Sequence, residues 1–287
     1  MYNIMLKPRC SPGLSSNNKN YTCYTDKSLE KLKNIWNMKH PDNKIKEKTS
    51  QAIWKALKKR FSNVCESERC WLRQTFIKNK IGGDILNYTF APDAPSSWKK
   101  DPNEWLSSRD IIHVMKHIEQ SHKTFVFIGP SPIDFDKKLI ENECVWDELC
   151  KFNLSSLLKK GKTKIGMIFN TDPHMKDGEH WISMFIDITG SKTTDPYIFF
   201  FDSNGDKIVP EVKVLVKRIK EQGEKLGIHF KFYENHPKIH QKTETECGMY
   251  SLYMIIELLN KRKTYKYFMD TRVPDKDVEI LRKIYFN

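Results

Sequence analysis

Four polar residues in the second half of the sequence have the types and the order that thiol-based catalysis requires. His180 begins the segment HWISMF, Asp202 ends the segment FFFD, and Cys247 opens the segment CGMYSLYMIIELLN. A thiol nucleophile needs an imidazole as base, a group that orients the imidazole, and a donor for the oxyanion. Gln241, six residues before the cysteine, has a side-chain N–H that can be this donor. We therefore predict a cysteine nucleophile with a histidine base, an orienting aspartate and an oxyanion-stabilising glutamine.

Cys247 stands at a position that favours a thiolate. The segment that it opens is apolar and long enough for a buried helix, and the unpaired N–H groups at a helix start favour an anion. Gly248 leaves the backbone open for the approach of a substrate. Glu244 and Glu246 lie just before the cysteine and would oppose a thiolate. We therefore expect both glutamate side chains to face solvent.

Each of these features alone has a more ordinary interpretation. A cysteine on an apolar helix is usually a small buried hydrophobe. A histidine beside a tryptophan at a strand start is usually a packing residue, and the run DSNG (202–205) is typical of a turn. The order of the features, with glutamine followed by Cys-Gly at a helix start, makes the combination specific.

Apolar runs predict the elements that would position these residues. The predicted strands are 124–129, 164–170, 180–188, 197–203 and 228–233. The run 197–203 is apolar up to its polar end, which is typical of a central strand buried on both faces. Helices are predicted to begin at Ser107 or Ser108, at Pro210, at Cys247 and within 271–277. The pattern predicts an α+β fold, with a central mixed sheet flanked by helices.

The first 90 residues differ from the rest in charge. They contain 18 Lys/Arg and 7 Asp/Glu, a net charge of +11, whereas residues 91–287 contain 31 and 29, a net charge of +2. Two amphipathic helices are predicted there, one capped by Asp26 and one by Thr49 or Ser50. The turn-rich stretch 91–102 is typical of a linker. We predict a basic, mainly helical arm domain at 1–90 and a catalytic domain at 91–287.

The charge of the arm is compatible with two kinds of surface. It could bind nucleic acid non-specifically, or it could be a lysine-rich surface that only keeps the protein soluble while the arm docks on the catalytic domain or grips a substrate. The cationic residues that lie mainly off the apolar face of the second helix, or just before it, are Lys44, Lys46, Lys48, Lys55, Lys58, Lys59 and Arg60.

The remaining composition predicts a soluble intracellular protein. The seven cysteines are scattered and odd in number, so we expect reduced thiols. No apolar run approaches the roughly 20 residues that span a bilayer, so no membrane association is expected. Cys65 and Cys70 lack a second matching pair, and His113, His117 and His122 lack a carboxylate or cysteine at ligand spacing. We predict no metal and no cofactor.

Three motifs together give the sequence a family resemblance. His-Trp at 180–181, Asp-Ser at 202–203 and Gln-x5-Cys-Gly at 241–248 resemble the SUMO-protease (ubiquitin-like-protein protease) superfamily, clan CE, which also contains the adenovirus protease. The segments QKTETECGMYSLYMI and YKYFMDTRVPDKDVE are similar to the polyprotein-processing proteases of large cytoplasmic DNA viruses, of the African swine fever virus type. The strong similarity covers residues 164–287, and the basic arm resembles the extra helical arm of such enzymes.

The resemblance implies the same four catalytic roles that the residue types indicate. It also implies that Trp181 packs near the catalytic pair and contacts substrate together with Gly248. Some viral relatives have asparagine at the position of Asp202, and an amide can also hold an imidazole.

The resemblance further implies cleavage after Gly-Gly. We predict a thiol endopeptidase that cuts viral core polyproteins during particle maturation, in the host cytoplasm (virus factory) and in the virion. The alternative is a deSUMOylating or deubiquitinating isopeptidase, whose partner is a ubiquitin-like protein with a Gly-Gly tail. A third reading is a nucleic-acid-binding scaffold with an inactive protease fold, and the complete set of four catalytic groups argues against it.

Overall fold

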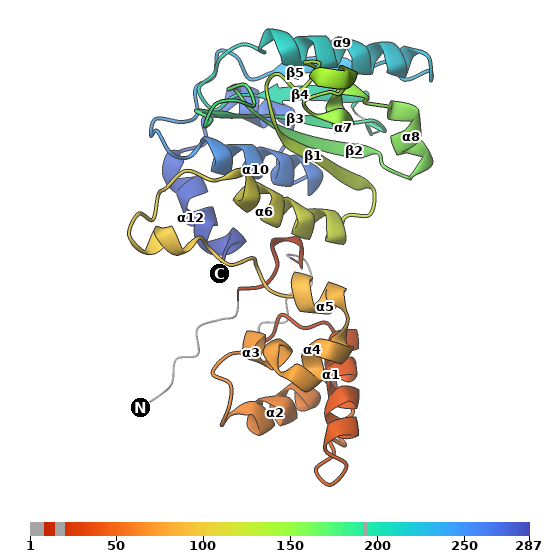
Figure 1. Cartoon of the computed structure of the whole chain (residues 1–287), viewed down its shortest axis with the longest axis vertical. Helices are drawn as coiled ribbons and strands as arrows, with labels where there is room; N and C mark the ends of the chain where they lie inside the picture. Colours follow the sequence, from red (N-terminus) through yellow and green to blue (C-terminus); the bar gives the residue numbers. More distant parts are fainter. Residues whose placement is uncertain (1–8, 15–20, 192–193) are drawn as a thin grey trace. The chain divides into compact units, whose positions relative to one another are not determined.

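The chain folds into two compact units (Figure 1). The computed structural model describes residues 9–14, 21–191 and 194–287, so residues 1–8 and 15–20 of the predicted arm lie outside the described residues. The first unit comprises Met1–Asp93 together with Ile284–Asn287, and the second comprises Ala94–Lys283. The division at Asp93 and Ala94 falls inside the stretch 91–102.

The first unit is built from short helices. Its elements are η1 (Pro12–Leu14), α1 (Asp26–Lys39), α2 (Ser50–Phe61), α3 (Glu68–Arg73), α4 (Thr75–Ile81) and α5 (Gly83–Tyr88). Thr25 caps α1, because its side-chain oxygen accepts a hydrogen bond from the Ser28 N–H, so the predicted cap at Asp26 is wrong by one residue. Thr49 caps α2 in the same way.

Aromatic residues fill the core of the first unit. The ring of Trp36 meets Phe61 edge-on at 5.1 Å, and Tyr24 stacks on Trp71 at 5.7 Å. The predicted apolar stripes of both long helices are buried in this core, apart from a half-exposed Trp54. Each buried large side chain contributes about 1.5–3 kcal/mol, so this unit has a hydrophobic core of its own.

A five-stranded mixed sheet organises the second unit. Its strands are β1 (Phe125–Pro132), β2 (Lys164–Asn170), β3 (Trp181–Asp187), β4 (Tyr197–Phe201) and β5 (Lys231–Glu234), and they lie side by side in this order. The outer pairs β1–β2 and β4–β5 are parallel, whereas β2–β3 and β3–β4 are antiparallel. All residues of β3 and β4 are buried, as expected for central strands. The predicted α+β fold with a central mixed sheet is confirmed.

Helices cover both faces of this sheet (Figure 1). The helices of the second unit are η2 (Ser96–Lys99), α6 (Ser108–Ser121), η3 (Ile140–Asn142), α7 (Asp147–Cys150), α8 (Leu154–Lys159), α9 (Pro210–Glu224), α10 (Cys247–Leu259), α11 (Tyr265–Asp270) and α12 (Asp275–Tyr285). Helix α9 lies over one face, and α6 and α10 lie over the other. Ser107 forms a capping box with Asp110 at the start of α6. Among the described residues, no helix combines the length and apolarity needed to span a membrane.

Six of the seven cysteines form disulfides, so the expectation of reduced thiols is wrong. The pairs are Cys10–Cys23, Cys65–Cys70 and Cys144–Cys150, with Cα–Cα distances of 5.1, 5.5 and 6.2 Å. These distances lie in the range that a disulfide requires. Cys247 is the free cysteine among the seven, all of which lie in the described ranges.

Candidate active site

His180 and Asp202 meet at one edge of the sheet. His180 directly precedes β3 and Asp202 directly follows β4, and antiparallel pairing places the start of one strand beside the end of the other. The Nε2 of His180 lies 2.8 Å from the Oδ1 of Asp202. The side chains are 16% and 5% exposed, so this contact is largely shielded from water.

Asp202 is held in place by a residue that the sequence did not reveal. The Oδ1 of Asn235 accepts a hydrogen bond from the Asp202 N–H at 2.9 Å, and its Nδ2 donates to the Asp202 carbonyl at 2.7 Å. The same Nδ2 donates to the carbonyl of Lys238 at 2.8 Å. The carboxylate of Asp202 also accepts from the Asn204 N–H at 2.8 Å. Backbone and side chain of the aspartate are therefore both fixed.

Cys247 completes a three-residue contact with this pair. It is the first residue of α10, it is 2% exposed, and its thiol lies near enough to the imidazole of His180 to raise the pKa of that ring. Burial lowers the pKa of His180, but the hydrogen bonds to Asp202 and Cys247 and the charges of both groups outweigh it and raise this pKa to about 10. The imidazole is therefore protonated at neutral pH, which is the state that accompanies a thiolate.

The side chain of Gln241 is anchored before Cys247 in the chain. Its Oε1 accepts a hydrogen bond from the Ser203 hydroxyl at 2.8 Å, and its Nε2 donates to the Thr243 carbonyl at 2.6 Å. Its backbone N–H donates to the carbonyl of Ser203, next to Asp202. A primary amide carries two N–H groups, so one donor remains beyond the bond to Thr243.

Trp181 and Gly248 lie against each other beside the cysteine. The indole N–H of Trp181 donates to the Leu106 carbonyl at 2.9 Å, and the ring is 7% exposed. A Cβ on Gly248 would lie 3.0 Å from the Cβ of Leu106 and 3.2 Å from the Cδ1 of Trp181. A Cβ there would require Leu106 or Trp181 to shift by a few tenths of an ångström, so the glycine permits close packing at the start of α10.

The glutamates before the cysteine behave differently from each other. Glu244 is exposed as predicted, but Glu246 is fully buried and pairs with Arg282. The prediction for Glu246 is therefore wrong, because a partner on a later helix replaces the water that the carboxylate would otherwise need.

The weak metal candidates are used in other ways. Cys65 and Cys70 are joined as a disulfide, and His122 hydrogen-bonds the Ile118 carbonyl and Asn260. Within the ranges that the structure describes, no group of three or more His, Cys, Asp or Glu is arranged to hold a metal ion.

Comparisons with known proteins find relatives that are named as cysteine proteases. No protein-family model matches the chain. A candidate thiol protease of Acanthamoeba polyphaga mimivirus is 29% identical over 238 residues, which cover 82% of this chain and 74% of that protein. The SUMO-1 cysteine protease of African swine fever virus is 24% identical over 249 residues, which cover 83% of this chain and 88% of that protein. The chain is a cysteine protease, and it is similar to a thiol protease and to a SUMO-1 cysteine protease of two viruses.

A solved structure extends this likeness to the fold. The crystal structure of the selenomethionine form of the African swine fever virus protease superposes with a TM-score of 0.63, at 19% identity. The match covers 99% of this chain and 97% of the viral protease. The likeness in fold therefore extends over the helical first unit as well as over the unit whose sheet carries the candidate site.

Proposed function

We propose that the protein is a thiol endopeptidase in which Cys247 is the nucleophile, His180 the base and Asp202 the orienting acid. The observation that carries the proposal is the contact of these three side chains at the edge of the sheet. Each comes from a different segment: His180 precedes β3, Asp202 follows β4 and Cys247 begins α10. Their arrangement is that of a cysteine nucleophile paired with an oriented imidazole.

The chemistry follows from the assigned positions. Since Nε2 of His180 faces Asp202, Nδ1 is the nitrogen that takes the proton of Cys247. The thiolate attacks the scissile carbonyl, an S–C bond forms, and the C–N bond breaks as the imidazolium gives its proton to the leaving amine. Water then attacks the thioester while the imidazole takes its proton, and the acid product leaves the free cysteine.

Gln241 is proposed to stabilise the oxyanion of these steps. Its anchored amide has a second N–H available, and the N–H of Cys247 lies at the unpaired start of α10. Preorganised donors of this kind lower the barrier because they need no rearrangement when charge develops.

We propose that the scissile bond follows Gly-Gly in a viral core polyprotein. Support comes from the narrow packing of Trp181, Leu106 and Gly248 next to Cys247, which favours substrate residues without side chains. A deSUMOylating or deubiquitinating activity uses the same Gly-Gly chemistry on another partner. The name of the African swine fever virus relative supports this alternative.

The test compares substrates and variants of the full chain. Peptides with Gly-Gly-Xaa should be cleaved and peptides with Ala-Ala-Xaa should not, and a viral polyprotein should be cut faster than SUMO or ubiquitin conjugates. Cys247→Ala should abolish cleavage with the fold intact. Without reductant, iodoacetamide should label Cys247 alone, since the other six cysteines are paired. Cleavage that survives in Cys247→Ala would disprove the assignment.

We further propose that the first unit binds nucleic acid non-specifically. Lys44, Lys46, Lys48, Lys55 and Lys59 are exposed on or just before α2. Two members of the predicted set are less available: Lys58 lies over the ring of Trp54, and Arg60 donates to backbone carbonyls. Binding should have a dissociation constant on the order of 10⁻⁴–10⁻⁶ M and weaken steeply with salt.

Retention on immobilised DNA tests this surface. Changing the five exposed lysines to glutamine should remove retention at low salt and leave peptide cleavage unchanged. The matched control changes five exposed lysines of the second unit, Lys160, Lys207, Lys213, Lys225 and Lys231. An equal loss of DNA retention in both five-lysine variants would mean that net charge, and not this surface, causes binding. If the unmodified protein is not retained on DNA, the arm is assigned to substrate recruitment instead.

We propose that the enzyme acts in the host cytoplasm and in the virion. The three disulfides favour the particle as the site of the oxidised form, because a reducing cytoplasm opposes disulfides and virion surfaces retain them. Thiol counting by mass spectrometry on protein from purified particles should find one free cysteine. Seven free thiols in particles would contradict this.

A further inference from the structure

A buried ion pair stands directly before the nucleophile. Glu246 is the last residue before α10, and its side chain is 0% exposed. The Nε of Arg282 donates to its Oε1 at 3.2 Å and its Oε2 at 3.1 Å, and Nη2 donates to Oε1 at 3.0 Å. The side chain of Arg282 is 5% exposed. Both charges are therefore removed from water next to Cys247.

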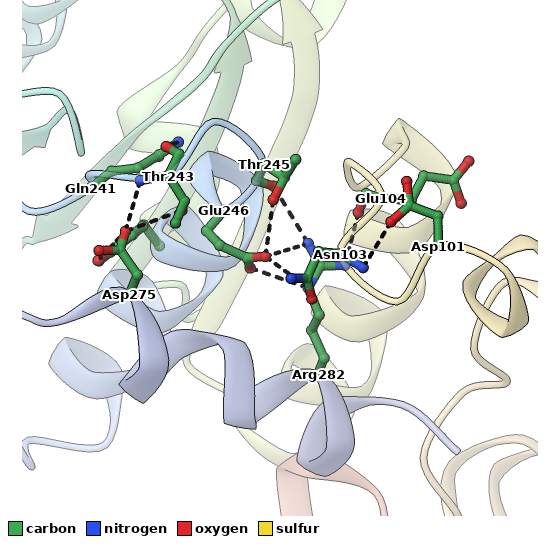
Figure 2. A network of polar contacts seen from close by, with 10 residues as sticks. Asp101, Asn103, Glu104, Gln241, Thr243, Thr245, Glu246, Asp275 and Arg282 are labelled. Atoms are coloured by element: carbon green, nitrogen blue, oxygen red, sulfur yellow. Dashed lines mark hydrogen bonds and ion pairs between the residues drawn. The ribbon is translucent and has the colours of Figure 1, made fainter.

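Arg282 binds more than this carboxylate (Figure 2). Its Nη1 donates to the Glu104 carbonyl at 2.8 Å, and its Nη2 reaches the Thr245 carbonyl at 3.4 Å. The guanidinium also lies over the ring of Trp98, 4.6 Å from the centroid. Arg282 thus holds the backbone carbonyl of Thr245 and the side chain of Glu246, the two residues that precede Cys247.

The other end of α12 holds the start of the same loop. The Oδ1 of Asp275 accepts from the Lys242 N–H at 2.9 Å and from the Thr243 hydroxyl at 3.2 Å, as Figure 2 shows in part. The carbonyl of Thr243 in turn accepts a hydrogen bond from the side-chain amide of Gln241. The loop from Gln241 to Cys247 is therefore bound near both ends by one helix.

We propose that Arg282 is a positioning residue for the cysteine protease reaction, which it serves by holding Glu246 in place and balancing its charge beside Cys247. The inference rests on the proposed role of Cys247 as nucleophile. Arg282 itself touches no reacting atom.

The charges of Glu246 and Arg282 act in opposite directions on the thiolate form of Cys247. Burial raises the pKa of Glu246 by more than the hydrogen bonds and charge of Arg282 lower it, with smaller effects from Thr245 and Glu279, so the pKa stays above its ordinary value. A carboxylate one residue before the thiol opposes a thiolate, whereas a balanced pair does not. A buried ion pair adds little stability compared with an apolar pair of the same size. A role in placing charge and backbone at the nucleophile explains its presence better than stability does.

Two single variants should move the thiol in opposite directions. Arg282→Met leaves the carboxylate unbalanced, so the pH midpoint for alkylation of Cys247 should rise by at least about half a unit. Glu246→Gln leaves the guanidinium unbalanced, so the midpoint should fall. The double variant should return to within about 0.3 units of the unmodified protein. His180, the titratable group that interacts with this cysteine, and Asp202, which contacts His180, are unchanged in all three.

Turnover provides the second measurement. Arg282→Met should lower kcat for a Gly-Gly peptide at least about tenfold and change KM less than about threefold, because the loop carries the nucleophile and the proposed oxyanion donor. Arg262→Met is the matched control. Arg262 pairs with the buried Glu257 toward the C-terminal end of α10, so this variant should lose stability without moving the alkylation midpoint.

The inference is overturned if folded Arg282→Met keeps the midpoint and kcat of the unmodified protein. It is also overturned if both single variants shift the midpoint in the same direction. If Arg282→Met does not fold, Glu246→Gln and the double variant decide, and an unchanged midpoint in Glu246→Gln overturns the inference. Failure of the proposed function looks different: cleavage would persist in Cys247→Ala. Alkylation needs no substrate, so the two failures are separable.

Discussion

Replacing Asn235 by alanine tests how the aspartate of the site is held. Asn235 is 1% exposed and makes three hydrogen bonds, two with the backbone of Asp202 and one with Lys238. In Asn235→Ala the buried N–H of Asp202 loses its partner, while the Asp202 carbonyl keeps the Gly205 N–H at 2.9 Å. The substitution therefore leaves one orphaned donor and removes two further hydrogen bonds.

The size of the effect follows from these contacts. An unsatisfied buried donor costs about 1–3 kcal/mol, and each of the other two bonds contributes about 0.5–1.5 kcal/mol. Because the Lys238 carbonyl is half-exposed and can bind water, we expect a total loss of about 2–4 kcal/mol. A shift of Asp202 also misplaces His180, so kcat should fall by about 10–100-fold.

Urea unfolding and peptide cleavage measure the two effects separately. Asn103→Ala, at an exposed position of the same unit, is the control and should stay within about 0.5 kcal/mol of the unmodified protein. A stability loss below about 1 kcal/mol would refute the hydrogen-bond reasoning. A full stability loss with unchanged kcat would refute the claim that Asn235 positions the aspartate.

Four further predictions concern the same region. Asp202→Asn should lower the pKa of His180 from about 10, and NMR of its ring protons measures this change. Because folding raises this pKa, the stability contributed by charged His180 is complete below about pH 6.5 and is lost as the pH rises toward 10. The variant should therefore lose less unfolding free energy, measured in urea, between about pH 6.5 and 10 than the unmodified protein does. Gly248→Ala should lower kcat/KM at least about tenfold, because the added Cβ would force Leu106 or Trp181 to shift beside Cys247, and equal activity would disprove the close packing. Gln241→Ala should lower kcat by roughly 100- to 1,000-fold with little change in KM, and full turnover would remove it from the oxyanion site. Burial lowers the pKa of His240 to about 4, so the stability it contributes is present above about pH 6.5 and lost as the pH falls through 4; His240→Gln should flatten the acid branch of the unfolding free energy, and an unchanged slope would assign that branch to other groups.

The parts of the fold that the sequence predicts well have strong local signals. Strands β2 to β4 and helix α10 are nearly continuous apolar runs with polar ends, so their existence and most of their bounds follow from pattern alone. Helices α3 to α5 and α11 are six or seven residues long. Segments of two turns carry too few apolar repeats to show a period, and these helices were not predicted.

The parts of the site that sequence missed depend on distant partners. Asn235 lies in a loop between a strand and a helix, and only the parallel pairing of β4 with β5 brings it to Asp202. Glu246 was predicted to face solvent because a charge usually does, yet Arg282 lies 36 residues later in the chain. The cysteine pairs likewise require the folded positions of their backbones. Residue types in the sequence indicate the chemistry, whereas the residues that hold the catalytic side chains in place depend on contacts between distant segments.

The grip of α12 on the catalytic loop has a consequence for the order of events during synthesis. Arg282 is translated 36 residues after Glu246, which at roughly 5–20 residues per second is about 2–7 seconds. During that interval the ribosome has already joined the nucleophile to the chain, but the helix that steadies its loop does not yet exist. If Arg282 positions this loop as proposed, we expect a nascent chain to have reduced activity until α12 has emerged and docked.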